Sequence, residues 1–135
     1  MNPTGFLLFI VEMIKILYLV IGGGIGTLLR FWVSSATGKL IENGFPAGTL
    51  IINLLGCLII GIVGGLNSDN SFSENTRLMV ITGLLGGFTT FSSFSMETVQ
   101  LFRNGQALWA IGYVLLSNIG GIMLAMGGFY LFRKA

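Results

Sequence analysis

The sequence predicts an all-α membrane protein with four transmembrane helices, and three observations lead to this fold class. Only 9% of the 135 residues are charged, whereas soluble domains carry about 25%. Hydrophobic residues make up 53% of the chain, so polar side chains are too few to cover a globule in water. The apolar residues also form four runs near or above the roughly 20 residues that a helix needs to cross a bilayer. We therefore expect residues 1–135 to form a single domain embedded in a lipid bilayer.

The first predicted span covers residues 16–33, and Arg30 lies near its end. A charged side chain at membrane depth is costly unless it faces protein or water. Arg30 is therefore either a buried structural residue or a side chain that extends to the interface, and its position favours neither alternative.

An apolar run, Phe6–Val11, precedes this span and is followed by Glu12 and Lys15. Either the first helix starts early, or residues 1–12 are a dispensable or interfacial extension and the natural start is Met13. The extension is the favoured interpretation, because MIKILYLVIGGG is a conventional opening for a small bacterial membrane protein.

The second and fourth predicted spans, residues 47–66 and 106–132, carry isolated polar side chains. Asn53 stands among Ile, Leu and Gly, so its amide must either bond to another helix or line a hydrated path. Tyr113 and Ser117 are spaced i, i+4 and share one face of a helix. They either bond to a neighbouring helix or form a polar track for an ion that has lost water.

The third predicted span, residues 78–102, contains the unusual segment GGFTTFSSFSMET. A double glycine followed by hydroxyl side chains weakens a helix, so we expect a break near Gly86. Carbonyls freed in mid-membrane are tolerated inside protein, where they hold small cations. Phe91 and Phe94 share a face, and the positive edges of their rings suit an anion. The span therefore favours an ion path. The sequence SENT, which precedes the span, is a plausible helix start.

Small residues four apart recur in every predicted span, as expected where helices pack closely in lipid. The pairs are Gly22/Gly26, Gly61/Gly65, Gly83/Gly87 and Gly121/Ala125. Basic residues near the span ends divide four to two between the two membrane faces: Lys15, Arg77, Arg133 and Lys134 against Lys39 and Arg103. This weak bias permits a fixed orientation or insertion both ways.

Several classes of function are excluded by composition. The chain has no histidine and a single cysteine, Cys57, which rules out a disulfide framework and a Cys/His zinc site. The net charge of +2, without a basic cluster, gives no support for nucleic-acid binding.

Three segments resemble the signatures of the Fluc or CrcB family of fluoride channels. They are GGGIGTLLRF at 22–31, FPAGTLIINLLGCLIIG at 45–61 and GLLGGFTTFSSFSME at 83–97. The resemblance covers the chain from about Met13 onward. It implies a passive fluoride exporter in the bacterial inner membrane, which is not an enzyme and which works as a dual-topology homodimer of antiparallel subunits.

The resemblance also implies roles for individual positions. Asn53, Phe91 and Phe94 match residues that line the fluoride pore, and Tyr113 and Ser117 match positions of a polar track. The hydroxyls of Thr90 and Ser92 would add donors to the same path.

Further positions match the structural parts of the family. Gly86 and Thr89 match residues whose backbone carbonyls hold a structural Na⁺, which is not transported, at the dimer interface. Arg30 matches a structural arginine near the pore vestibule. A heterodimer with a paired homologue stays open.

Two other functions compete with a channel. A small four-span, proton-coupled multidrug exporter needs a titratable carboxylate at membrane depth, and Glu12 and Glu97 are the candidates. A non-transporting assembly subunit is the third interpretation, although its spans should be plainer.

Overall fold

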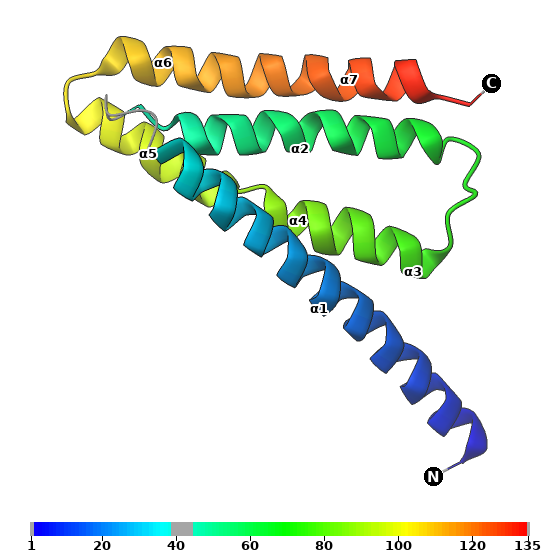
Figure 1. The fold of residues 1–135 in the computed structure, drawn as a ribbon. Coiled ribbons are helices and arrows are strands. Elements are labelled where there is room, and N and C mark those ends of the chain that lie inside the picture. Colours follow the sequence, from blue (N-terminus) through cyan, green and yellow to red (C-terminus); the bar gives the residue numbers. More distant parts are fainter. Residues whose placement is uncertain (1, 39–44, 135) are drawn as a thin grey trace.

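The computed structural model describes residues 2–38 and 45–134, and the regular structure of this part is helical throughout (Figure 1). Four helical stretches are long and apolar enough to span a membrane: Pro3–Thr37, Ala47–Leu66, Glu74–Arg103 and Ala107–Phe132. The prediction of an all-α chain with four spans is confirmed at this level. Lys39, which entered the charge count above, lies outside the described residues.

Helix α1 is one continuous helix, Pro3–Gly38, and is much longer than the predicted span of 16–33. Its 36 residues correspond to about 54 Å at 1.5 Å per residue, well beyond a hydrocarbon core of about 30 Å. The early start is physically reasonable, because no helix breaker separates the run Phe6–Val11 from Lys15. Lys15 pairs with Glu12 on the same helix at 3.4 Å and with Glu74 of the third span at 3.0 Å.

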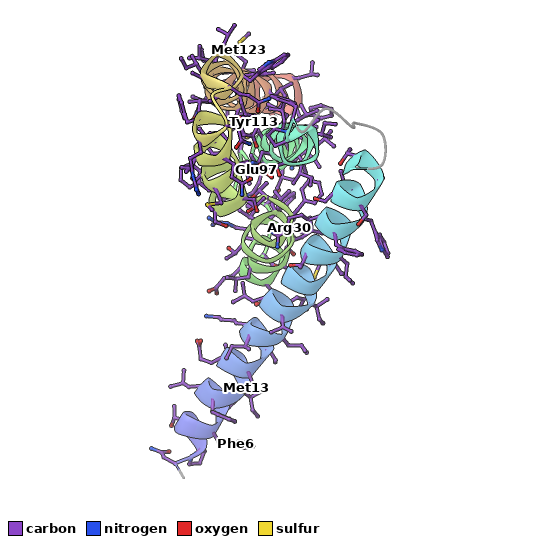
Figure 2. All side chains as sticks on the ribbon, turned by 90° about the vertical axis from the view of Figure 1, so that its left-hand side faces the viewer. Phe6, Met13, Arg30, Glu97, Tyr113 and Met123 are labelled. Carbon is purple, nitrogen blue, oxygen red and sulfur yellow. The ribbon has the colours of Figure 1, made fainter. Side chains whose placement is uncertain are left out.

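The N-terminal end of α1, before Lys15, extends away from the other helices (Figure 1), and Figure 2 shows Phe6 and Met13 far from Tyr113. Its large apolar side chains, including Phe6 and Leu7, are exposed. The structure thus shows that residues 3–12 continue a helix; whether they are dispensable stays a prediction.

Helix α2 covers Ala47–Leu66, and the fourth span consists of α6 (Ala107–Leu115), η2 (Leu116–Gly120) and α7 (Gly121–Phe132). The segment η2 is a wider, π-helical turn. Helix α2 and the fourth span lie side by side in Figure 1.

The third span is divided into α3 (Glu74–Arg77), the π-helical η1 (Leu78–Leu85), α4 (Gly86–Phe88) and α5 (Phe91–Arg103). It begins at the predicted SENT signal, because the Ser73 side chain caps the helix by accepting a hydrogen bond from the Thr76 N–H at 3.1 Å.

The predicted close packing through glycine is confirmed. A Cβ added to Gly26 would collide with the carbonyl oxygen of Leu84, so α1 and the first half of the third span touch backbone to backbone. In the same way, a Cβ on Gly61 would collide with the carbonyl oxygen of Ala125 on α7. We call these two contacts the glycine seams. One joins α1 to η1 and α4, and the other joins α2 to α7.

A small buried core lies near the N-terminal end of α2, where α5 and α6 pack against it. It comprises Leu50, Phe94, Leu101, Ala110 and Tyr113. Phe94 and Phe45 both contact the ring of Tyr113, with centroids 5.1 and 5.6 Å away. This core fixes α5, the helix after the break, against α2 and α6, and so positions the polar residues described next.

Candidate functional site

The third span breaks at Thr89 and Thr90, whose backbones are extended (φ −82°, ψ 160° and φ −150°, ψ 112°). Gly86 and Gly87 remain helical, so the break lies two to three residues after the double glycine that suggested it. The local chemistry explains this position. The Thr90 side chain caps α5 by accepting a hydrogen bond from the Ser93 N–H at 3.2 Å, as threonine does at a helix start.

Asn53 on α2 binds the break from the side. Its amide nitrogen donates to the Thr90 carbonyl oxygen at 3.0 Å, and its amide oxygen accepts from the Thr90 N–H at 2.9 Å. A buried backbone group needs such a partner where water is absent. Asn53 therefore replaces the helical bonds that Thr90 gives up, which is why its amide is tolerated among apolar residues.

This arrangement has a consequence for Gly86 and Thr89. In a continuous helix their carbonyls would accept from the N–H groups four residues later, those of Thr90 and Ser93. Those two N–H groups instead donate to the Asn53 side chain and to the Thr90 hydroxyl. The two carbonyls predicted to hold Na⁺ have thus lost their α-helical donors, which fits a ligand set of backbone oxygens.

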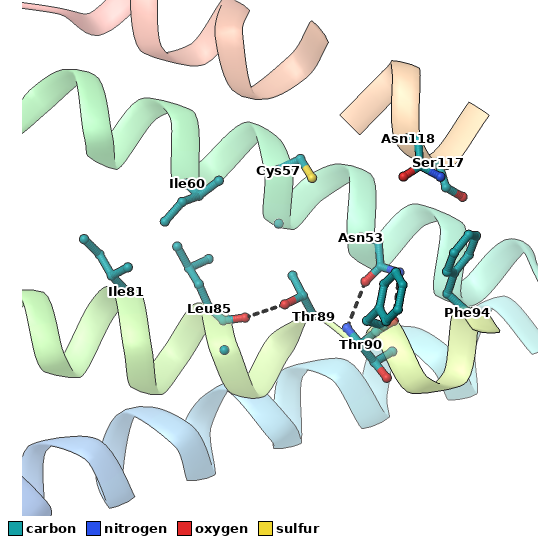
Figure 3. A pocket seen from close by; sticks show the side chains of 13 residues that line it. Asn53, Cys57, Ile60, Ile81, Leu85, Thr89, Thr90, Phe94, Ser117 and Asn118 are labelled. Atoms are coloured by element: carbon teal, nitrogen blue, oxygen red, sulfur yellow. Dashed lines mark hydrogen bonds between the residues drawn. The ribbon is translucent and has the colours of Figure 1, made fainter. Parts of the chain in front are cut away.

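A cavity of about 420 Å³ lies beside the break (Figure 3). It brings together five of the seven residues predicted to conduct an ion: Asn53, Thr90, Phe91, Phe94 and Ser117. Gly86 and Thr89 also line it, while Tyr113 and Ser92 do not. The Ser92 hydroxyl is 3.4 Å from that of Thr90.

The two phenylalanines have different surroundings. Phe94 is buried against Tyr113, whereas Phe91 is 77% exposed on the outside of the chain. Their ring centroids are 5.6 Å apart, at 45°. Phe94 forms part of the wall of the cavity, and Phe91 extends from its open side.

Tyr113 belongs to a second polar group, centred on Glu97. The Glu97 carboxylate accepts from the Thr49 hydroxyl at 2.7 Å and from the Tyr113 hydroxyl at 2.8 Å. A pocket of about 190 Å³ lies against Thr49 and Glu97 and extends to Ser34 and Thr37 on α1.

Sequence reasoning missed Thr49 and weighed Glu97 only as a proton carrier. One signal was available: Thr49 lies four residues before Asn53, on the same face of α2. The pairing with Glu97, 48 residues away, could not be read from spacing. Glu12, the other carboxylate considered for proton coupling, is exposed and paired with Lys15.

Two further predicted residues have no partner in the described part of the chain. The Ser117 hydroxyl is buried and makes no hydrogen bond there. Arg30 is half-buried on α1, and its guanidinium forms no hydrogen bond or ion pair with residues 2–38 or 45–134. The structure thus leaves an unused donor at Ser117, inside the cavity wall.

Comparison with known proteins places this geometry in context. The model of one protein family, described as CrcB-like protein, Camphor Resistance (CrcB), matches residues 17–129. A protein from Azobacteroides pseudotrichonymphae is 44% identical over 121 residues, which is 88% of this chain and 97% of that protein. Proteins from Flavobacterium psychrophilum (38%, 88% and 97%) and Parabacteroides distasonis (44%, 88% and 93%) are similar along most of their length. All three are named fluoride-specific ion channel FluC.

Proposed function

The chain belongs to the CrcB family, and from that premise we propose that it is a fluoride-specific ion channel that lets F⁻ leave the cytoplasm passively. Four apolar spans and bacterial relatives make it a multi-pass membrane protein of bacteria. The observation that carries the proposal is identity of 38–44% along nearly the whole length of relatives bearing that name. We place it in the inner membrane, where export lowers cytoplasmic fluoride.

The cavity beside the break supplies suitable chemistry. Fluoride is small and strongly hydrated, so a pore must replace its water with other donors. Asn53 keeps one amide hydrogen after bonding to Thr90, and Ser117 keeps its hydroxyl hydrogen. The ring edges of Phe91 and Phe94 add weak positive potential.

No lysine or arginine lines this cavity among the described residues. Conduction requires that an ion be held well enough to enter and weakly enough to leave. Uncharged donors meet that requirement better than a full positive charge would. We assign the hydroxyls of Thr90 and Ser92 to the same path. We also assign Tyr113 to it, because its ring contacts that of Phe94.

We propose that the backbone carbonyl oxygens of Gly86 and Thr89 hold a structural Na⁺. Their loss of α-helical donors supports this assignment. When bound, such an ion would add a fixed positive charge near the anion path.

A second copy of the chain is the partner we propose, in an antiparallel homodimer with dual topology. Polar groups at mid-span support this proposal. The amide side chain of Asn118 and the backbone of Gly86 are exposed on the single chain, and hydrocarbon offers them no hydrogen-bond partner. The weak bias of basic residues, four against two, permits insertion both ways. We also propose that Arg30, on α1, has a structural role.

The proton-coupled exporter is not favoured. Glu97 is held by two hydroxyl donors, and the relatives are named as ion channels, which are not a class of enzyme.

The test is a fluoride-electrode assay on purified protein in liposomes. We expect F⁻ efflux without a proton gradient, with no comparable efflux of chloride, and loss of efflux in Phe91→Ala and Phe94→Ala. Vesicles that retain their fluoride as protein-free vesicles do, or that release chloride at a similar rate, contradict the proposal.

A further inference from the structure

Most donors on one wall of the 420 Å³ cavity are already used. The Thr90 N–H bonds to Asn53, and the Thr89 hydroxyl donates to the Leu85 carbonyl at 2.9 Å. Asn53 spends one of its two amide hydrogens on the Thr90 carbonyl. Among the side chains of this wall, which is formed by α2 and the break, Asn53 keeps an amide hydrogen for a ligand.

The opposite wall carries two neighbouring side chains, Ser117 and Asn118, both in η2 (Figure 3). The Asn118 amide is 2.7 Å from the Val114 carbonyl oxygen. A carbonyl can only accept, so the nearer amide atom is the nitrogen and the orientation of the amide is settled. Asn118 thus keeps one free amide hydrogen beside the unused hydroxyl of Ser117.

The shape of η2 explains why two consecutive residues reach one cavity. It is a π-helical turn, wider than an α-helical one, and such single turns occur often at functional sites. Gly120 and Gly121 let α2 approach closely. A Cβ added to Gly120 would lie 3.3 Å from the Leu54 side chain, and one added to Gly121 would lie 3.0 Å from the Cys57 sulfur. The two walls are thereby held face to face.

The charge of the cavity selects the sign of its ligand. Its lining contains no Lys, Arg, Asp or Glu, and Cys57 is the one titratable side chain among the described residues that line it. Free N–H and O–H groups without a nearby carboxylate favour an anion, and the absence of a Lys or Arg side chain from the lining keeps binding weak.

Resting on the proposed function, we propose that Asn118 is a further ion-binding residue: its free amide hydrogen and the Ser117 hydroxyl form a donor pair that contacts a partly dehydrated fluoride ion crossing the cavity. The bond from Asn118 to Val114 holds the amide in place before the ion arrives. Asn118 is exposed on the single chain and lines the cavity, so its free amide hydrogen can reach an ion there.

The test compares three variants of the full chain in liposomes with a fluoride electrode. Asn118→Leu removes the amide at similar volume, Asn118→Asp keeps the shape but presents a negative charge, and Asn118→Gln keeps both donors. We expect the Leu variant to slow F⁻ efflux about tenfold, as loss of a hydrogen bond to a charged group does. The Gln variant should retain most of the rate.

The Asp variant distinguishes ion contact from a structural role. It should be slow at about pH 8 and faster at about pH 5.5, because protonation removes the repelling charge and restores an O–H donor. Efflux from protein-free vesicles is subtracted at each pH, since HF crosses lipid unaided. Asn104→Leu and Asn104→Asp, in the exposed turn after α5, are the matched controls and should change neither rate nor pH profile.

Each outcome decides the inference. Unchanged efflux in the folded Asn118→Leu variant overturns it and leaves the channel proposal intact. Failure of both the Leu and Asp variants to fold also overturns it, because the amide is then structural. Wild-type vesicles that hold their fluoride overturn the proposed function itself.

Discussion

The chain joins its helices in two ways, and the contrast shows how a frame and a site coexist in lipid. In the glycine seams, backbones meet with no side chain between them. In what we call the polar seam, the contacts of α2 with the break, α5 and α6, side chains bridge the helices. Its members are Asn53, Thr90, Thr49, Glu97 and Tyr113, joined by hydrogen bonds of 2.7–3.0 Å. The polar seam borders the 420 Å³ cavity and the 190 Å³ pocket.

This difference follows from what lipid offers to a helix. Apolar helices gain little by leaving hydrocarbon for one another, so close backbone contact stabilises the frame. Such a contact leaves no room for an ion. Polar side chains keep the helices further apart and must satisfy one another, and any donor left over is available to a ligand.

Replacing Asn53 should produce the largest effect on this comparison. Asn53→Leu leaves the N–H and C=O of Thr90 without partners in an apolar setting, and each such group costs about 1–3 kcal/mol. We expect a loss of about 3 kcal/mol in unfolding free energy, together with loss of fluoride efflux. Thermal unfolding in detergent and the electrode assay measure the two effects.

Asn53→Asp is the control for that variant, because it keeps an acceptor for the Thr90 N–H and can donate to the Thr90 carbonyl only when its carboxyl is protonated. Its stability should be intermediate. A Leu variant as stable as the wild type would show that the break holds without the polar seam.

A methyl group in a glycine seam should have the next largest effect. Gly26→Ala places a Cβ against the Leu84 carbonyl, so one helix must move. We expect a loss of about 1–3 kcal/mol in unfolding free energy. Gly24→Ala, two residues away with no atom within 4 Å of the added Cβ, should be neutral or stabilising by up to about 1 kcal/mol.

Unfolding of the two purified variants in detergent compares them directly. Equal stability of Gly24→Ala and Gly26→Ala would mean that the α1 seam yields easily and does not act as a frame.

Glu97→Gln should have a smaller effect, and it tests whether the polar seam carries protons. The amide keeps one acceptor for the hydroxyls of Thr49 and Tyr113 but loses the charge, so we expect a loss of about 1 kcal/mol in stability. Efflux of fluoride should persist without a proton gradient, since Glu97 does not line the 420 Å³ cavity. Efflux that depends on an imposed proton gradient and disappears in this variant would favour the exporter.

The features that could be predicted from sequence are those set by local pattern. The four spans follow from apolar runs of sufficient length, and the glycine seams follow from small residues four apart. The break was expected near Gly86 because glycine and hydroxyl residues disfavour a helix. Its position at Thr89 and Thr90 depends on Asn53, which lies 37 residues away and bonds both backbone groups of Thr90.

The features that could not be predicted depend on tertiary contacts. Thr49 and Glu97 are common polar residues near span ends, and only folding brings them to Tyr113. The early start of α1 was the less favoured alternative, because MIKILYLVIGGG is a conventional opening for a membrane protein. In the structure Glu12 and Lys15 lie on the same helix and pair with each other, and Lys15 also pairs with Glu74 of the third span. Nothing in the sequence singled out Asn118, and only the structure shows that it lines the 420 Å³ cavity together with its neighbour Ser117.

The smallest effect is expected outside both seams, at a carboxylate in water that can be compared with Glu97. Asp69, in the turn after α2, is 3.0 Å from the Lys134 ammonium. Hydrogen bonds from the Ser71 side chain and from Lys134 lower the pKa of Asp69 from 3.8 to about 2. A lowered pKa means that the contact stabilises the fold above pH 3.8 and that this contribution is lost as the pH falls toward 2.

Asp69→Asn should therefore melt slightly below the wild type at neutral pH, with the difference closing between about pH 4 and pH 2. The difference should be smaller than that of Glu97→Gln, because water and salt screen an exposed ion pair. Fluoride efflux should not change. If Asp69→Asn cost as much stability as Glu97→Gln, hydrogen bonds to a carboxylate would be worth the same in water as in the polar seam, and the contrast between the two settings would fail.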